Sequence, residues 1–175
     1  MKRLVCILML ALSACGTTPK KLERSSVPPP DQRPVDLALA ATVFAPRVPL
    51  PDVELPRAIR PARYIVEADG VLRASVGAAS DAAAFPPRVR QLSPRQADQV
   101  WRALLDSGLL DDANPNRLSD PESAMRSGDR TTAMIFVSYQ GKRTTLRVLL
   151  DRATPDAVAA ERVIDRLAEL AWLPQ

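Results

Sequence analysis

The sequence contains no histidine and only two cysteines among its 175 residues. The lack of histidine excludes Ser-His-Asp and Cys-His catalysis, imidazole zinc sites and a histidine-based pH switch near neutrality. Both cysteines, Cys6 and Cys15, lie close to the start of the chain, so the rest of it has no thiol to offer. These absences remove the commoner nucleophilic and zinc-dependent enzyme classes.

Other chemical signatures are also missing. The sequence has six glycines and no glycine-rich phosphate loop, nucleophile elbow or cluster of metal ligands. The formal net charge is only +4 and the two signs are mixed, whereas a nucleic-acid-binding face needs clustered Lys and Arg. We therefore expect no enzyme activity, no catalytic residue, no metal, no cofactor and no nucleic-acid partner.

The first 15 residues carry the most explicit pattern in the chain. An apolar run at 4–12 follows two basic residues and is shorter than the roughly 20 residues of a membrane-spanning helix. It ends in Leu12-Ser13-Ala14-Cys15, which resembles the lipobox of bacterial lipoproteins. The resemblance implies that residues 1–14 are a removed signal peptide and that Cys15 carries acyl chains. Gly16 after it implies an outer-membrane lipoprotein facing the periplasm; an ordinary cleaved signal is the alternative.

Residues 15–60 are predicted to be the lipidated cysteine and a proline-rich tether. Ten of the 17 prolines fall between Pro19 and Pro61, and proline favours extended chain without backbone donors. One apolar island interrupts the tether at 35–44, with Phe44 at its end. It could form a short helix, a strand docked on the domain, or a segment that folds on a partner. We favour docking, because free apolar side chains in solvent are unusual.

Residues 61–175 are predicted to form the folded domain. Asp69-Gly70 predicts a two-residue hairpin turn that pairs Ala68 with Val71 and Val66 with Arg73. Residues 78–90 are rich in proline and small side chains, and are expected to be a loop. Ser93-Pro94 with Gln96 then predicts a capped helix start. The apolar stripe of this helix is Ala97, Val100, Trp101, Leu104 and Leu105, with Trp101 as a core anchor.

A second hairpin is predicted from 131–139 and 142–150, joined at Gln140-Gly141. One face of it is expected to be core. The other face carries Met134, Phe136, Arg143 and Arg147, which we interpret as a candidate partner-binding face. The alternative is an ordinary outer sheet face on which arginine stems cover apolar neighbours. The residues assigned to the core are Ala133, Ile135, Val137, Leu146, Val148 and Leu150.

The remaining segments complete the expected layout. Residues 111–130 form a polar loop whose Asp112 and Asn114 imitate a calcium loop, but Arg117 and Ser123 replace the glycine and glutamate required there. Thr154-Pro155 opens a last helix whose end, at Trp172, is expected to pack on the core. The order hairpin, helix, hairpin, helix predicts an α+β two-layer sandwich: a four-stranded antiparallel sheet (β-β-α-β-β-α) with both helices on one face.

The run from Ser107-Gly108-Leu109-Leu110 through the 132–148 hairpin, with Gly141 at its turn, to the final amphipathic helix resembles emfourin-type domains, which are small bacterial proteinase inhibitors. Other small lipoprotein domains share this layout. The resemblance spans 62–172 and rests on element order and apolar spacing. It implies a protein-binding module in the envelope, with an inhibitor as one form. The alternative is a structural accessory lipoprotein of an envelope assembly or transport complex.

Overall fold

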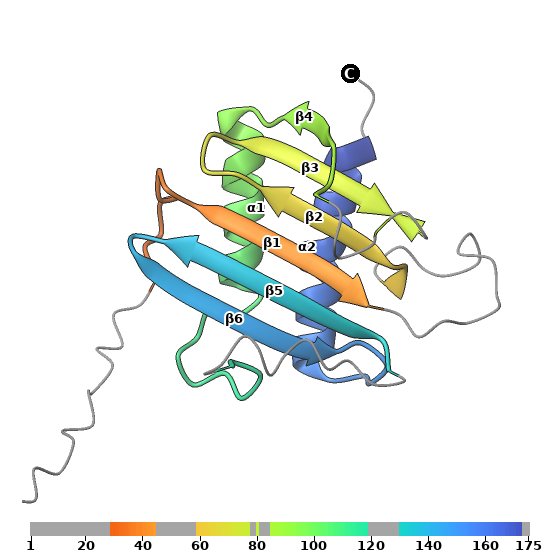
Figure 1. Ribbon diagram of the computed structural model, residues 1–175. Coiled ribbons are helices and arrows are strands. Elements are labelled where there is room, and N and C mark those ends of the chain that lie inside the picture. The colour runs from red at the N-terminus through yellow and green to blue at the C-terminus, as the bar shows by residue number, and fades with distance from the viewer. Residues whose placement is uncertain (1–28, 45–58, 78–79, 81–84, 119–129, 173–175) are drawn as a thin grey trace, which may run out of the picture.

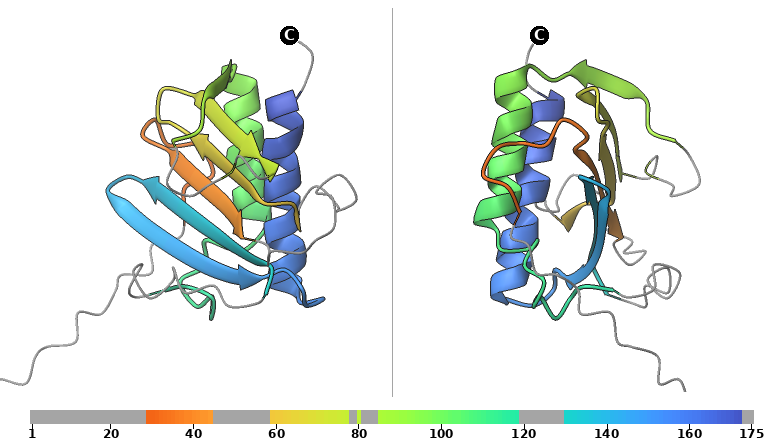
Figure 2. Two further views of the ribbon diagram at one scale, coloured as in Figure 1. Left: turned by 45° about the vertical axis from the view of Figure 1, so that its right-hand side comes forward. Right: turned by 90° about the vertical axis from the view of Figure 1, so that its left-hand side faces the viewer.

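A computed structural model describes residues 29–44, 59–77, 80, 85–118 and 130–172. Six strands form one antiparallel sheet in the order β4-β3-β2-β1-β5-β6, and two helices pack together on one of its faces (Figures 1 and 2). The α+β class is therefore confirmed, whereas the four-stranded sheet is wrong. The elements are β1 Ala38–Phe44, β2 Ala62–Val66, β3 Val71–Val76, β4 Arg88–Gln91, α1 Pro94–Asp106, β5 Thr132–Tyr139, β6 Lys142–Leu149 and α2 Pro155–Trp172.

The first additional strand, β1, comes from the apolar island that the sequence placed within a tether. Leu39, Ala41 and Val43 are buried and alternate with more exposed neighbours, as expected of a strand with one covered face. β1 pairs with β2 on one side and with β5 on the other. It therefore separates the two predicted hairpins and occupies the middle of the sheet (Figure 1).

The second additional strand, β4, lies in the segment expected to be a loop. It is four residues long, pairs with β3, and its register shifts next to Leu72 and Arg73. Two of its four residues are arginines. A short, charged and irregular strand is typical of a protected sheet edge, and it carries little of the periodicity that reveals a strand in sequence.

The first hairpin is real, but its predicted register is wrong by one residue. The Glu67 N–H donates to the Val71 carbonyl at 2.9 Å, so three residues form the loop instead of two. Gly70 has φ +83°, whereas Asp69 is not left-handed, which is the pattern of a three-residue loop with a bulge. Arg73 consequently lies opposite Ile65.

The second hairpin has the predicted register. Tyr139 pairs with Lys142, and both turn residues are left-handed, with φ +47° at Gln140 and +72° at Gly141. This is the geometry of a two-residue type I′ turn. All six residues assigned to the core of this hairpin are buried.

Both helices begin where the sequence predicts. Ser93 accepts from the Gln96 N–H while the Gln96 side chain accepts from the Ser93 N–H, which completes the capping box of α1. In α2 the Thr154 hydroxyl accepts from the Ala157 N–H. Trp172 was expected to close on the core, but it is 59% exposed at the end of α2.

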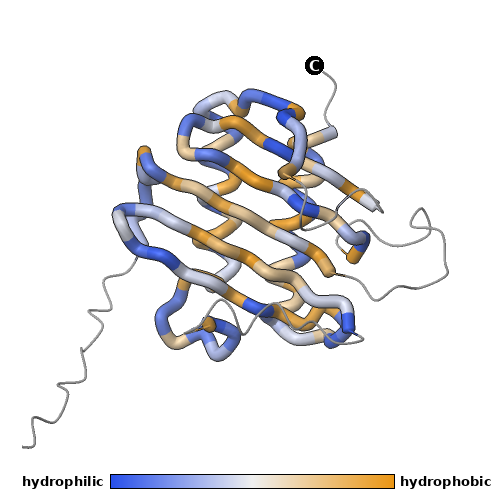
Figure 3. Tube along the Cα trace, viewed as in Figure 1, coloured by the Kyte–Doolittle hydropathy of each residue, from blue (hydrophilic) through white to orange (hydrophobic). Residues whose placement is uncertain are grey.

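The core lies between the sheet and the helix pair. Figure 3 shows apolar stretches along the central strands and polar segments toward the edges of the sheet. Neither helix in the described chain has the length and apolar character needed to cross a bilayer. The largest fully buried side chains include Trp101, Tyr64, Leu39, Leu72, Leu104, Leu109, Ile135, Leu146, Ile164 and Leu167.

Candidate functional site

The sheet has one face under the helices and a second face that we call the open face. Within the described residues, no helix or further strand covers the open face (Figure 2). Because side chains alternate along a strand, the neighbours of the core residues point to it. The strand residues of the open face include Ala38, Ala40, Thr42, Phe44, Arg63, Ile65, Arg73, Ser75, Arg88, Thr132, Met134, Phe136, Ser138, Arg143, Thr145, Arg147 and Leu149.

The four residues predicted as a partner-binding face lie together on the open face. Met134 pairs with Arg147 in one row across the sheet. Ser138, four residues further along β5, pairs with Arg143 in another row. Phe136 lies between these rows and is 37% exposed. It is the one large exposed apolar side chain in any described strand, because the others lie in helices or connecting segments.

Several residues of the open face escaped the sequence prediction. β1 inserts Ala40 beside Phe136, and Ala40 pairs in turn with Ile65 of β2. The corrected register of the first hairpin brings Arg73 to the same face. The signal that could have found β1 is the alternation of Leu39, Ala41 and Val43. No comparable signal could have revealed the register error, because an Asp-Gly pair is compatible with both two-residue and three-residue hairpin loops.

An exposed aromatic side chain also lies at the far end of the open face. The Phe85 ring is stacked against the Arg73 guanidinium, whose carbon lies 4.8 Å from the ring centroid. Arg73 also forms an ion pair with Glu67 at 2.7 Å. These contacts hold Arg73 in place from two directions, so the guanidinium presents a defined surface beside an aromatic ring.

The charges of the open face are strongly one-sided. Its described strands carry five arginines and no carboxylate, and Glu67 follows β2 directly. The two helices together carry four arginines and six carboxylates. Among the residues that the structure describes, the sheet face is therefore positive and the helix layer mildly negative. This asymmetry does not follow from the small net charge of the whole chain.

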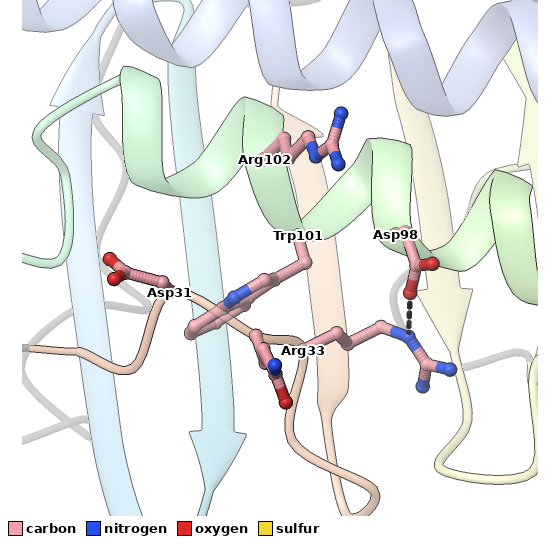
Figure 4. Close-up of a pocket in the computed structure, with 6 residues that line it drawn as sticks. Asp31, Arg33, Asp98, Trp101 and Arg102 are labelled. Carbon is pink, nitrogen blue, oxygen red and sulfur yellow. Dashed lines mark hydrogen bonds and ion pairs between the residues drawn. The ribbon is translucent and has the colours of Figure 1, made fainter.

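A polar pocket of about 310 Å³ lies on the other side of the molecule, between residues 31–33 and α1 (Figure 4). Trp101 lines it but is only 1% exposed. Its indole N–H donates to the Pro30 carbonyl at 3.1 Å, and its ring meets Tyr139 edge-on at 5.3 Å. Arg33 and Asp98 pair at 2.8 Å (Figure 4). The pocket thus results from contacts that hold residues 30–33 against α1.

The start of the polar loop is fastened to the rest of the domain. Asp112 forms an ion pair with Arg117, which also donates to the Thr144 hydroxyl. The Leu118 N–H donates to the Thr145 carbonyl at 2.8 Å, and the Arg147 N–H donates to the Asn116 carbonyl at 2.9 Å, so this segment pairs with the outer edge of β6. The Asp112 carboxylate, one of the oxygen ligands suggested by the calcium-like pattern, is therefore already paired with Arg117. Residues 119–129 of this loop lie outside the described chain.

One titratable group responds to this packing. Burial raises the pKa of the Tyr139 phenol above its usual value. The positive charge of Arg117 opposes the rise in pKa and the negative charge of Asp112 adds to it. The phenol is therefore held in its neutral form beside Trp101.

The remaining predicted features have no counterpart among these contacts. Cys15 and the rest of the lipobox lie outside the described residues. In the segments that are described, no group of three or more His, Cys, Asp or Glu side chains is close enough to hold a metal ion.

No family model, no curated protein and no solved structure matches this chain.

Proposed function

We propose that this chain is a bacterial lipoprotein, anchored through Cys15 to the periplasmic side of the outer membrane, whose domain binds an envelope protein through the open face. The observation that carries the proposal is the exposed Phe136 at the centre of an arginine-rich sheet face. Protein interfaces are enriched in aromatic residues and arginine relative to the rest of the surface.

The sheet is a suitable support for such an interface. Phe136 is flanked by Ala40 on one strand and Thr145 on the other, so small side chains leave its ring accessible. The backbone beneath is held by paired strands on both sides, which limits the conformational entropy lost on binding. The alternative is an ordinary sheet exterior, for which a substitution of Phe136 would leave partner binding unchanged.

The emfourin resemblance supports a proteinase as the partner, which would make the domain an inhibitor. An accessory role through residues 35–44 would need that segment to be free to dock on another protein. Since Ala38–Phe44 is the central strand β1, that segment is committed to the fold of its own domain. An accessory role would therefore also have to use a surface such as the open face.

The test compares Phe136→Ser with Val158→Ser in the full-length lipoprotein. Phe136 and Val158 are similarly exposed, at 37% and 40%, but Val158 lies on α2 in the helix layer. Pull-downs from solubilised membranes should lose the partner with Phe136→Ser and retain it with Val158→Ser. Loss of a few-fold to tenfold in affinity is expected for an interface aromatic side chain. Equal retention by both variants would remove the open face as the binding surface.

The nature of the captured protein distinguishes the two forms of the function. A soluble proteinase whose turnover falls on adding the lipoprotein supports inhibition, whereas an integral-membrane complex supports an accessory role. The anchor is tested separately with Cys15→Ser, which should abolish labelling by a palmitate analogue and release the protein from the membrane fraction.

A further inference from the structure

We propose that residues 30–33 form a strap that an ion pair closes on α1 and that opens while the domain stays folded, which lengthens the reach of the membrane anchor. Only the gain in reach rests on the proposed function, because it needs the lipid at Cys15. The opening itself depends on contacts within the domain.

Among the described residues, two polar contacts hold the strap on α1. At its first residue the Pro30 carbonyl accepts from the Trp101 indole N–H at 3.1 Å, and at its last residue Arg33 pairs with Asp98 at 2.8 Å (Figure 4). The side chains of Arg33 and Asp98 are 24% and 51% exposed, so solvent and salt screen their attraction. Both residues between these contacts, at positions 31 and 32, are exposed.

Protein atoms do not fill the space beneath the strap. The polar pocket of about 310 Å³ lies there, and its lining includes Asp31, Gln32 and Arg102 (Figure 4). A segment above such a pocket buries little apolar surface against the helix, and apolar burial is the main force that holds a segment to a domain. Segments with few buried apolar contacts open at a lower free energy than the whole domain does.

The chain directly after the strap is held more firmly. Pro34 and Leu37 are buried, and the Leu37 N–H donates to the Pro34 carbonyl at 3.3 Å, which closes a turn before β1. Because β1 is paired on both sides, we expect opening to stop at Pro34 and to leave the sheet intact. Release of the chain between Pro30 and Pro34 adds about 13 Å to the reach of the tether.

The experiment attaches bimane, a dye that a nearby indole quenches, at Gln32→Cys in the full-length lipoprotein in detergent. Gln32 and Trp101 line the same pocket, so the closed strap should keep the dye dim, and Trp101→Phe gives the unquenched level. Asp98→Asn removes the ion pair. Asp106→Asn is the matched control, because Asp106 is an exposed aspartate of the same helix that pairs with no described residue.

Dye emission should rise with urea before the far-ultraviolet circular dichroism of the domain changes, because the strap opens first. Asp98→Asn should raise the equilibrium constant for opening about two- to fivefold and leave the circular dichroism transition in place. Added salt should have the same effect on the wild type and on Asp106→Asn, but not on Asp98→Asn.

The gain in reach is measured in vesicles that carry an acceptor dye on their lipid headgroups. The donor dye is placed at Arg162→Cys, on an exposed position of α2. Energy transfer should be lower with Asp98→Asn than with Asp106→Asn, because the opened strap lets the domain move farther from the bilayer.

Each half of the proposal has an outcome that overturns it. If dye emission and circular dichroism change together, the strap opens only with the whole domain. If Asp98→Asn and Asp106→Asn give the same emission, the ion pair does not close the strap. Equal energy transfer, or a failure of the protein to bind vesicles, refutes the gain in reach. The second of these results also contradicts the anchor, whereas failure of the Phe136→Ser test contradicts the open face alone.

Discussion

At the scale of single residues, Trp101 joins three separate parts of the chain. Its indole N–H binds Pro30, its ring packs on Tyr139, and its backbone belongs to α1. The sequence assigned Trp101 to the core from helical periodicity alone. It could not show the hydrogen bond to Pro30, because that contact spans 71 positions in the chain.

We expect Trp101→Phe to lower the free energy of unfolding by about 2 to 3 kcal/mol. The change leaves the Pro30 carbonyl without its donor and opens a small cavity beside Tyr139. Urea denaturation followed by far-ultraviolet circular dichroism measures the loss. Trp172→Phe is the matched control, because Trp172 is 59% exposed and its change should cost less than about 0.5 kcal/mol. Equal losses in the two variants would refute the anchoring role.

The raised pKa of Tyr139 makes stability depend on alkaline pH. Burial favours the neutral phenol in the folded state, so folding binds its proton more tightly. This contribution is fully present below the unfolded pKa of about 10 and is lost as the pH rises through the higher folded value. The free energy of unfolding should therefore fall less for Tyr139→Phe than for the wild type between about pH 9 and 11. Parallel pH profiles would contradict the assignment to Tyr139.

At the scale of secondary-structure elements, the two hairpins show what local patterns can and cannot specify. Gln140-Gly141 predicted a two-residue turn, and both residues do adopt positive φ. Asp69-Gly70 carried an equally strong signal, but the turn there includes a third residue. The difference between these turns moves Arg73 from the core face to the open face, because one residue of register exchanges the two faces of a strand.

The two turns should also differ in their tolerance of alanine. Gly141 has φ +72° and open space around an added Cβ, so Gly141→Ala should cost only about 1 kcal/mol of backbone strain. A Cβ on Gly70 would lie 3.2 Å from the Gln91 side-chain nitrogen, which donates to the Asp69 carbonyl at 2.7 Å. Gly70→Ala should therefore cost about 1 kcal/mol more.

A double-mutant cycle isolates that extra cost. In the Gln91→Ala background the Cβ of residue 70 no longer meets an amide, so the two glycine substitutions should become nearly equal. Thermal unfolding of the single and double variants gives the comparison. An extra cost at Gly70 that persists without the Gln91 amide would show that the backbone alone is responsible.

At the scale of the whole molecule, β1 decides where the folded unit begins. It pairs with both β2 and β5, so without it the two halves of the sheet would not be joined. The segment before it is held to α1 through Pro30 and Arg33. If Cys15 carries the lipid, fifteen residue steps separate it from Pro30, which allows a separation of at most about 50 Å.

Deletion of residues 34–46 should therefore abolish folding of the domain. The deletion removes the central strand and exposes the apolar edges of β2 and β5. Loss of far-ultraviolet ellipticity and rapid degradation by added proteinase would report it. Deletion of residues 17–27 is the control and should leave the thermal midpoint within about 2 °C, because these residues precede the contacts of Pro30. A folded Δ34–46 variant would contradict the role of β1.

The sequence by itself determined the α+β class, the start of each helix, the second hairpin and its core face, and the grouping of Met134 with Phe136. These depend on caps, turn residues and periodicity, which act over a few positions. Only the tertiary structure decided that six strands form the sheet, that β1 lies at its centre, and that Arg73 shares the open face with Phe136. The physical reason is that strand order and register depend on pairings between distant segments. Each such strand is too short, and the charged β4 too polar, to reveal its partner by its own pattern.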